Sequence, residues 1–76
     1  MADFILYGTA GCHLCEEAEE LVLQVGLVFD KQDIMADEDA TQRYAVRIPV
    51  LLRQSSGLEL GWPFEAQRLR DFAEQA

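Results

Sequence analysis

Two cysteines, Cys12 and Cys15, lie with two residues between them in the stretch GTAGCHLC (residues 8–15), and they are the chain's only thiols. Such a pair can form a redox-active disulfide, bind a metal ion or remain inert in the core. A structural zinc site needs four ligands, whereas this sequence supplies two cysteines and one histidine, His13. An iron–sulfur centre would also need ligands from elsewhere. A redox disulfide is therefore the leading prediction, and a non-enzymatic adaptor, a metal or iron–sulfur carrier and an inert scaffold remain alternatives.

The residues around the pair predict a helix that would hold the two sulfurs in different surroundings. Apolar residues recur with helical spacing at Leu14, Cys15, Ala18, Leu21, Val22 and Val25, and Gly26 is placed to end the helix. Cys12 would stand at the helix N-terminus, where unpaired N–H groups and the helix dipole favour a thiolate. Cys15 would lie on the apolar side and stay protonated until needed. This asymmetry predicts that Cys12 attacks and Cys15 resolves.

Charged neighbours act on the predicted thiolate in opposite directions. His13 lies between the cysteines, and as an imidazolium it could lower the pKa of Cys12. Glu16 and Glu17 follow one turn later, and their negative charge would raise the same pKa. The alternative for His13 is a side chain that simply points into solvent.

The rest of the chain predicts the elements that must position this pair. Strands are expected at residues 3–8, 27–34, 47–53 and 58–62, with helices at 14–25, 37–45 and, after Pro63, 64–75. The first two strands need a helical crossover and should be parallel. The last two should form an antiparallel hairpin through a turn at residues 55–57. The order β-α-β-α-β-β-α predicts an α/β class with a mixed sheet of four strands.

Length and charge limit the classes of function. The 76 residues, numbered 1–76, predict a single domain. The net charge of −8 would repel nucleic acid and anionic membranes, and it is typical of a freely soluble protein or of one with a basic partner. The sequence shows no apolar run long enough for a membrane span and no export signal, so we expect a cytoplasmic protein. A monomer is expected because the helix pattern leaves no surplus apolar surface.

The site residues and the element order together resemble a known family. Cys12-His13-Leu14-Cys15 after the first strand, and Arg47-Ile48-Pro49 before the third, are similar to the glutaredoxin-like branch of the thioredoxin superfamily. The resemblance is closest to small bacterial glutaredoxin-like proteins and covers nearly the whole chain. It implies a thioredoxin-like fold and a thiol–disulfide oxidoreductase that needs no resident metal or nucleotide cofactor. The implied partners are protein or small-molecule disulfides, with glutathione or a thioredoxin-type protein as reductant.

The resemblance also assigns roles to particular residues. It implies that Cys12 is the nucleophile and Cys15 the resolving thiol. It further implies that Pro49 follows a cis peptide bond and lies beside the disulfide. The backbone of Ile48 would then be free to pair with an extended thiol substrate.

Several residues depart from the usual glutaredoxin pattern. His13 and Leu14 replace the Pro-Tyr or Pro-Phe that often separates the cysteines, and both are candidate substrate contacts. The stretch LGWPFEAQ replaces the Gly-Gly-x-x-Asp loop that holds the amine of glutathione. The question whether glutathione serves as a co-substrate therefore stays open. Arg47 could hold a substrate carboxylate, or it could be an exposed, solvated residue. Trp62 could contact substrate, although core packing beside Phe64 is the alternative.

Overall fold

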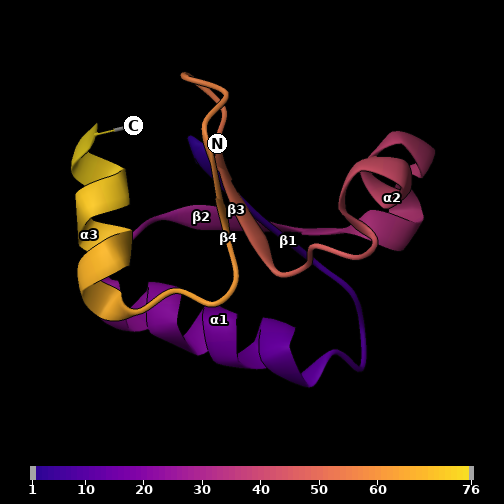
Figure 1. The fold of residues 1–76 in the computed structure, drawn as a ribbon, viewed down its shortest axis with the longest axis horizontal. Coiled ribbons are helices and arrows are strands. Elements are labelled where there is room, and N and C mark those ends of the chain that lie inside the picture. Colours follow the sequence, from indigo (N-terminus) through magenta and orange to yellow (C-terminus); the bar gives the residue numbers. More distant parts are fainter. Residues whose placement is uncertain (1, 76) are drawn as a thin grey trace.

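The strands and helices occur in the predicted order (Figure 1). The computed structural model describes residues 2–75, so the two ends of the predicted domain, residues 1 and 76, lie outside it. The elements are β1 (Phe4–Gly8), α1 (His13–Val25), β2 (Phe29–Asp33), the 3-10 helix η1 (Ile34–Ala36), α2 (Glu38–Tyr44), β3 (Val50–Arg53), β4 (Glu59–Gly61) and α3 (Ala66–Gln75).

The four strands form one mixed sheet in the order β2-β1-β3-β4. β1 pairs in parallel with β2, because the chain returns through α1, and antiparallel with β3. β3 and β4 form the antiparallel hairpin. The predicted α/β class, parallel first pair and terminal hairpin are therefore confirmed.

Helices cover both faces of the sheet, and each face has its own core. Leu6 and Leu51 point to the face where α1 and α3 pack, and both are buried there. Val50, next in sequence to Leu51, joins the second cluster, together with Tyr44 of α2. Successive residues of a strand point to opposite faces, so the two central strands contribute to both cores. Figure 1 shows α2 well separated from α1 and α3.

The ends of the elements depend on local hydrogen bonds, and some predicted bounds were too long. The strand predicted at 27–34 ends at Asp33, because the Asp33 carboxylate accepts from the N–H of Met35 at 2.9 Å and starts η1. The strand predicted at 47–53 begins at Val50. The hairpin partner predicted at 58–62 is confined to Glu59–Gly61.

The last helix also begins later than predicted. Helix α3 starts at Ala66 rather than residue 64, and Pro63 therefore does not occupy its first turn. Instead, Pro63 follows a cis peptide bond, and Phe64 is buried in the core. At the end of α1 the prediction is confirmed, since Gly26 has φ 87° and its N–H bonds the carbonyl of Val22 at 3.2 Å. Across residues 2–75, no helix combines the length and the apolar character needed to cross a membrane.

Candidate functional site at the Cys12–Cys15 disulfide

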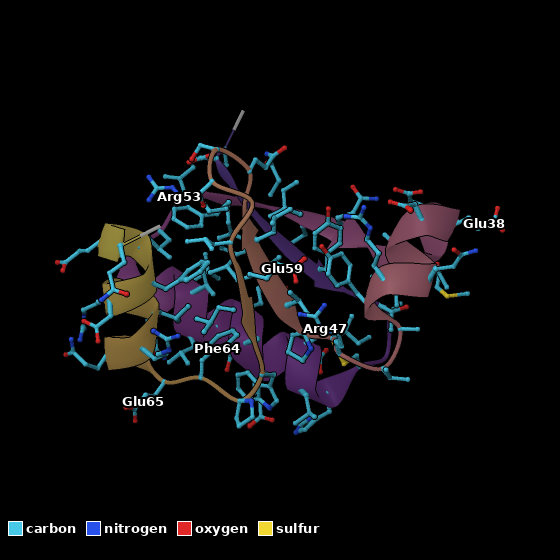
Figure 2. All side chains as sticks on the ribbon, turned by 45° about the horizontal axis from the view of Figure 1, so that its top comes forward. Glu38, Arg47, Arg53, Glu59, Phe64 and Glu65 are labelled. Carbon is cyan, nitrogen blue, oxygen red and sulfur yellow. A yellow bond between two sulfur atoms is a disulfide. The ribbon has the colours of Figure 1, made fainter. Side chains whose placement is uncertain are left out.

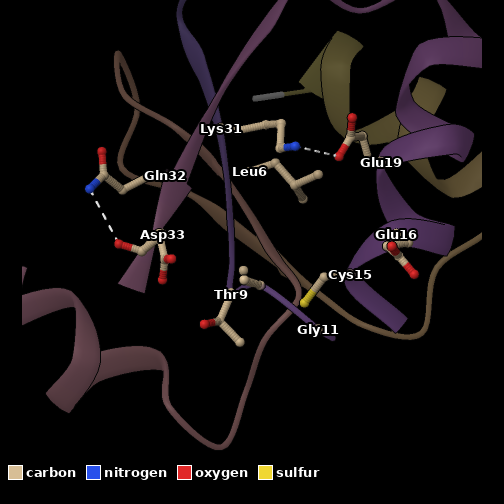
Figure 3. Close-up of a pocket in the computed structure, with 11 residues that line it drawn as sticks. Leu6, Thr9, Gly11, Cys15, Glu16, Glu19, Lys31, Gln32 and Asp33 are labelled. Carbon is tan, nitrogen blue, oxygen red and sulfur yellow. Dashed lines mark hydrogen bonds and ion pairs between the residues drawn. The ribbon is translucent and has the colours of Figure 1, made fainter. Parts of the chain in front are cut away.

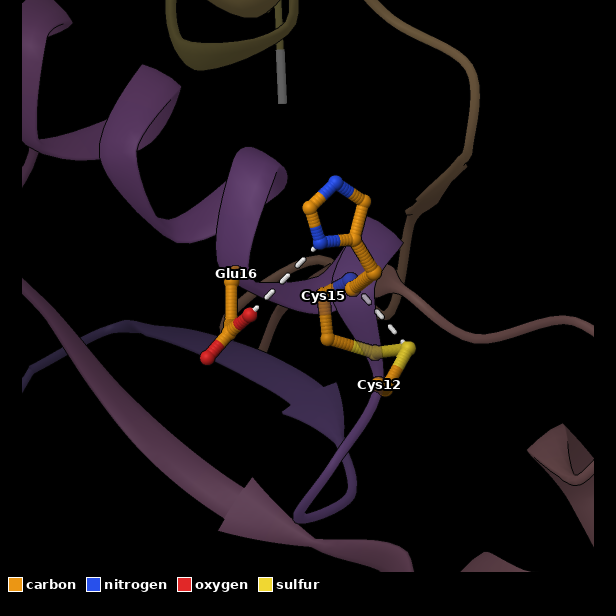
Figure 4. The surroundings of a disulfide bond; sticks show 4 residues. Cys12, Cys15 and Glu16 are labelled. Carbon is orange, nitrogen blue, oxygen red and sulfur yellow. Dashed lines mark hydrogen bonds and ion pairs between the residues drawn. A yellow bond between two sulfur atoms is a disulfide. The ribbon is translucent and has the colours of Figure 1, made fainter.

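The two cysteines form a disulfide at the start of α1 (Figure 4). Their Cα atoms are 5.2 Å apart, inside the usual range for this bond. Cys12 is the N-cap residue of α1, with extended backbone, and its Sγ accepts a hydrogen bond from the N–H of Cys15 at 3.2 Å. Cys12 is half-buried, whereas Cys15 is only 9% exposed. The predicted positions, with Cys12 at the helix tip and Cys15 one turn inward, are as observed.

Gly8, the last residue of β1, lies against the disulfide. A Cβ atom on Gly8 would lie 3.0 Å from Sγ of Cys15, so Cys15 packs directly against this end of β1. In the antiparallel pair of β1 and β3, Tyr7 lies opposite Val50, and Pro49 directly precedes Val50 in the chain. Pro49 is buried, and the Ile48–Pro49 bond is cis, as the resemblance implied.

Only part of the Ile48 backbone is available to pair with a substrate. Its N–H donates to the carbonyl of Tyr44 at 3.0 Å, and the N–H of Arg47 donates to the same carbonyl at 2.8 Å. The expectation that the whole Ile48 backbone is free to pair with substrate was therefore wrong for its N–H. The physical reason is that these residues satisfy the open carbonyl at the C-terminal end of α2. The carbonyl of Ile48 is the group left for a substrate N–H.

Arg47 already holds a carboxylate within the chain. Its Nη2 lies 2.9 Å from Oε1 of Glu59 (Figure 2), and its guanidinium lies 5.5 Å from the centre of the Tyr44 ring. The Tyr44 hydroxyl donates to the other oxygen of Glu59 at 2.5 Å. Hydrogen bonds from Tyr44 and then Arg47 hold the pKa of Glu59 below its ordinary value, against the opposing effect of burial. Burial, followed by the bond to Glu59, raises the pKa of Tyr44.

Sequence reasoning missed Glu59. The residue lies 12 positions beyond Arg47, and only the β3–β4 hairpin brings the two side chains together. The one available signal was a carboxylate in the short strand that was predicted to pair next to the Arg47 segment. The consequence for the site is that Arg47 is not an unpaired cation waiting for a substrate carboxylate.

The other predicted contact residues differ in exposure. His13 is 86% exposed, and its Nδ1 lies 3.9 Å from Oε2 of Glu16. Leu14 is 46% exposed, so it presents apolar surface between the cysteines instead of joining the buried side of α1. Trp62 is half-buried, packs against the main core and meets Phe64 edge-on with ring centres 5.0 Å apart. The packing alternative for Trp62 is therefore observed.

A cavity of about 440 Å³ lies beside Cys15, between the start of α1 and the ends of β1 and β2 (Figure 3). Its wall includes Lys31 and Glu19, whose Nζ and Oε1 atoms are 2.9 Å apart. The sequence did not predict this cavity because its walls come from three separate elements. In the described part of the chain, no group of three or more His, Cys, Asp or Glu side chains is placed to hold a metal ion.

Comparison with solved structures places this geometry among known proteins. The X-ray structure of Northeast Structural Genomics target protein XcR50 from X. campestris matches with a TM-score of 0.87 and 38% identity, covering 96% of this chain and 97% of that chain. Protein Ne2328 from Nitrosomonas europaea matches with a TM-score of 0.71 and 26% identity, over 93% and 89% of the two chains. A mutant of the thioredoxin-like protein BC3987 has a TM-score of 0.71 at 18% identity over 97% of each chain, a likeness of fold alone.

Comparison with sequences points the same way. No curated protein matches the chain. The family model described as "Glutaredoxin-like domain (DUF836)" matches residues 3–74, which is nearly the full length. The chain therefore belongs to the glutaredoxin-like domain family DUF836.

Proposed function

We propose that this protein is a thiol–disulfide oxidoreductase that works through Cys12 and Cys15. The observation that carries the proposal is the unequal placement of the two sulfurs at one helix terminus. Cys12 caps α1 and receives the N–H of Cys15 at 3.2 Å, while Cys15 is 9% exposed. A thiolate at Cys12 is favoured by that N–H and by the helix dipole.

The reaction exchanges two electrons in two displacement steps. The Cys12 thiolate attacks one sulfur of the substrate disulfide, forms a mixed disulfide and expels the first substrate thiolate. Cys15 then loses its proton and attacks Sγ of Cys12, and the second substrate thiolate leaves. The substrate is reduced to two thiols, which take up the proton released by Cys15 and one proton from water, and the protein is oxidised to the Cys12–Cys15 disulfide. The same steps in reverse oxidise a substrate dithiol.

The surroundings of the pair suit this exchange. Leu14 offers exposed apolar surface next to the sulfurs, and the Ile48 carbonyl can accept a hydrogen bond from an extended substrate. The substrates proposed are protein or small-molecule disulfides in the cytoplasm, and a thiol reductant must return the protein to the dithiol. Electron flow in either direction depends on the reduction potentials of the partners.

A single-turnover assay with a neutral small disulfide, bis(2-hydroxyethyl) disulfide, tests the proposal. The fully reduced chain should release both substrate thiols and end as an intramolecular disulfide. Cys15→Ser should release one thiol and stop as a mixed disulfide on Cys12, which mass spectrometry detects. Cys12→Ser should release substrate thiol far more slowly, because the remaining sulfur is buried.

Two results would contradict the proposal. Full activity in Cys12→Ser would show that the assigned attacker is wrong. Unreactive thiols in a purified chain that carries zinc or a coloured cluster would favour a carrier instead. Circular dichroism of each variant shows whether a loss of activity reflects loss of the fold.

A further inference from the structure

We infer that the preferred substrate is a polypeptide disulfide flanked by basic residues, and that acidic thiol compounds such as glutathione react poorly. This inference rests on the proposed function and names the substrate class for the same disulfide. It is carried by the charge placed on α1 next to Cys12, together with the internal pairing of the cations around the site.

One face of α1 is acidic from the disulfide onward. Positions spaced by three or four residues share a helix face, and here they are His13, Glu16, Glu17 and Glu20. These residues line a surface hollow of about 430 Å³, together with Glu19. The hollow starts at His13, the residue that directly follows the attacking Cys12. A positively charged side chain next to a substrate cystine would meet carboxylates here.

The positively charged side chains near the disulfide do not neutralise the acidic face of α1. Arg47, two residues before Pro49, is bonded to Glu59 at 2.9 Å, and Lys31, on the wall of the cavity beside Cys15, is bonded to Glu19 at 2.9 Å. A substrate carboxylate would have to displace one of these partners. It would also approach a chain with net charge −8. Like charges across a contact oppose association, and opposite charges accelerate encounter.

The length of the acidic face favours a polypeptide over a small molecule. Glu20 lies seven residues beyond His13, a rise of about 10 Å along the helix axis. A small disulfide held at Cys12 does not extend that far, whereas neighbouring residues of a polypeptide do. Leu14, next to Cys15 and 46% exposed, adds apolar surface of the kind that a peptide backbone and its side chains can cover.

Peptides of different charge test the inference. Three symmetric disulfide dimers of short peptides share a central cysteine, which is flanked by lysines, glutamines or glutamates. Reduced wild-type protein is mixed with each at low ionic strength, and released peptide thiol is measured after acid quenching. The lysine peptide should react fastest and the glutamate peptide slowest. The difference should shrink when salt is added, because screening shortens the range of these charges to about 10 Å at 0.1 M.

A pair of matched double variants locates the effect. Glu17→Gln with Glu20→Gln removes two exposed carboxylates of the acidic face, while Glu38→Gln with Glu74→Gln removes two exposed carboxylates on α2 and α3. For each protein we take the ratio of the lysine-peptide rate to the glutamate-peptide rate. Comparing this ratio between wild type and variant cancels the intrinsic reactivity of each peptide disulfide. We expect the first double variant to lower this ratio about fivefold and the second to leave it nearly unchanged.

Each outcome decides a separate point. No reaction with the glutamine peptide would overturn the proposed function itself. Reaction with the glutamine peptide but equal rates for the lysine and glutamate peptides would overturn only the charge preference. An equal loss in both double variants would show that net charge acts rather than the α1 face. Cystamine, a small dication, should be little affected by Glu17→Gln with Glu20→Gln. A loss as large as that of the lysine peptide would overturn the polypeptide assignment.

Discussion

Gly8 of β1 lies so close to Cys15 of α1 that a methyl group on Gly8 would meet Sγ at 3.0 Å and Cβ at 3.1 Å. Few real Cβ atoms approach another side chain this closely. The contact shows why the strand ends in glycine at this point: the resolving cysteine occupies the space that any larger residue would need. Helix α1 can therefore start close against the sheet, with the disulfide at the end of β1.

Replacing Gly8 with alanine should test this contact. Gly8→Ala is expected to lower the free energy of unfolding by about 1–3 kcal/mol, the usual cost of overpacking. Urea denaturation of the oxidised protein measures the change. Gly61→Ala is the matched control, because a Cβ there would meet no atom within 4 Å. In a second series measured with all chains in the reduced state, removing Sγ through Cys15→Ala should reduce the cost of Gly8→Ala, and strict additivity of the two substitutions would show that they do not interact.

Leu51 should be a principal contributor to the main core. The residue is 0% exposed and lies in the cluster that joins the sheet to α1 and α3. Leu51→Ala should lower the free energy of unfolding by about 2–5 kcal/mol, because it removes buried methyl groups and leaves a cavity. Leu58→Ala, at a leucine 51% exposed, should change it by less than about 0.5 kcal/mol. Equal effects in urea titrations would contradict the placement of Leu51.

Gly26 ends α1 in a conformation that disfavours other residues. Its φ of 87° is left-handed, and its N–H bonds the carbonyl oxygens of Val22 and Leu23. Gly26→Ala should cost about 1–2 kcal/mol of stability, since a Cβ strains this backbone region. Thermal and urea unfolding measure the loss. Gln24→Ala, an exposed position two residues earlier, should be near neutral, because alanine is at least as good a helix former as glutamine. A comparable loss there would show that the cap is not the cause.

The Glu59 carboxylate should make stability depend on acidity. Hydrogen bonds from Tyr44 and Arg47 hold the pKa of Glu59 below its ordinary value, so the ionised form is favoured in the folded chain. A lowered pKa contributes stability that is present above the unfolded value and is lost as pH falls through the folded value. Glu59→Gln should therefore destabilise the protein near neutral pH, and this effect should shrink as the pH falls through the folded pKa of Glu59. The check is urea unfolding at a series of pH values.

A second variant separates the proton effect from packing around Glu59. Tyr44→Phe keeps the ring and removes the hydroxyl, which is the leading cause of the lowered pKa. In that background the acid-dependent difference between Glu59 and its glutamine variant should become smaller. A difference that is the same at neutral and acidic pH would contradict the assigned role of the carboxylate.

Patterns within short stretches were enough to predict the order of elements and the environment of the cysteines. The spacing of Ala18 and Val22 identified the buried side of α1, and both are 0% exposed. Gly26 marked the end of the helix, and Cys12 marked its start. These features follow from backbone geometry over one or two turns, so residues near in sequence carry the needed information.

Local patterns were less informative where a side chain changed the backbone path. The Asp33 carboxylate started η1 and cut short the predicted strand, and the bonds from Arg47 and Ile48 to Tyr44 delayed the start of β3. Such competition between hydrogen-bond partners is settled by the geometry of each segment rather than by its composition.

The sequence by itself determined that Cys12 and Cys15 share a helix terminus with unequal burial, because i and i+3 positions and an apolar stripe are local properties. Only the tertiary structure decided that Glu59 pairs with Arg47, that Gly8 packs against Cys15 and that Lys31 lines a cavity beside the disulfide. The physical reason is that each of these relationships joins separate elements. Their distances depend on strand register and on how helices pack against the sheet, and no short stretch of the chain encodes either.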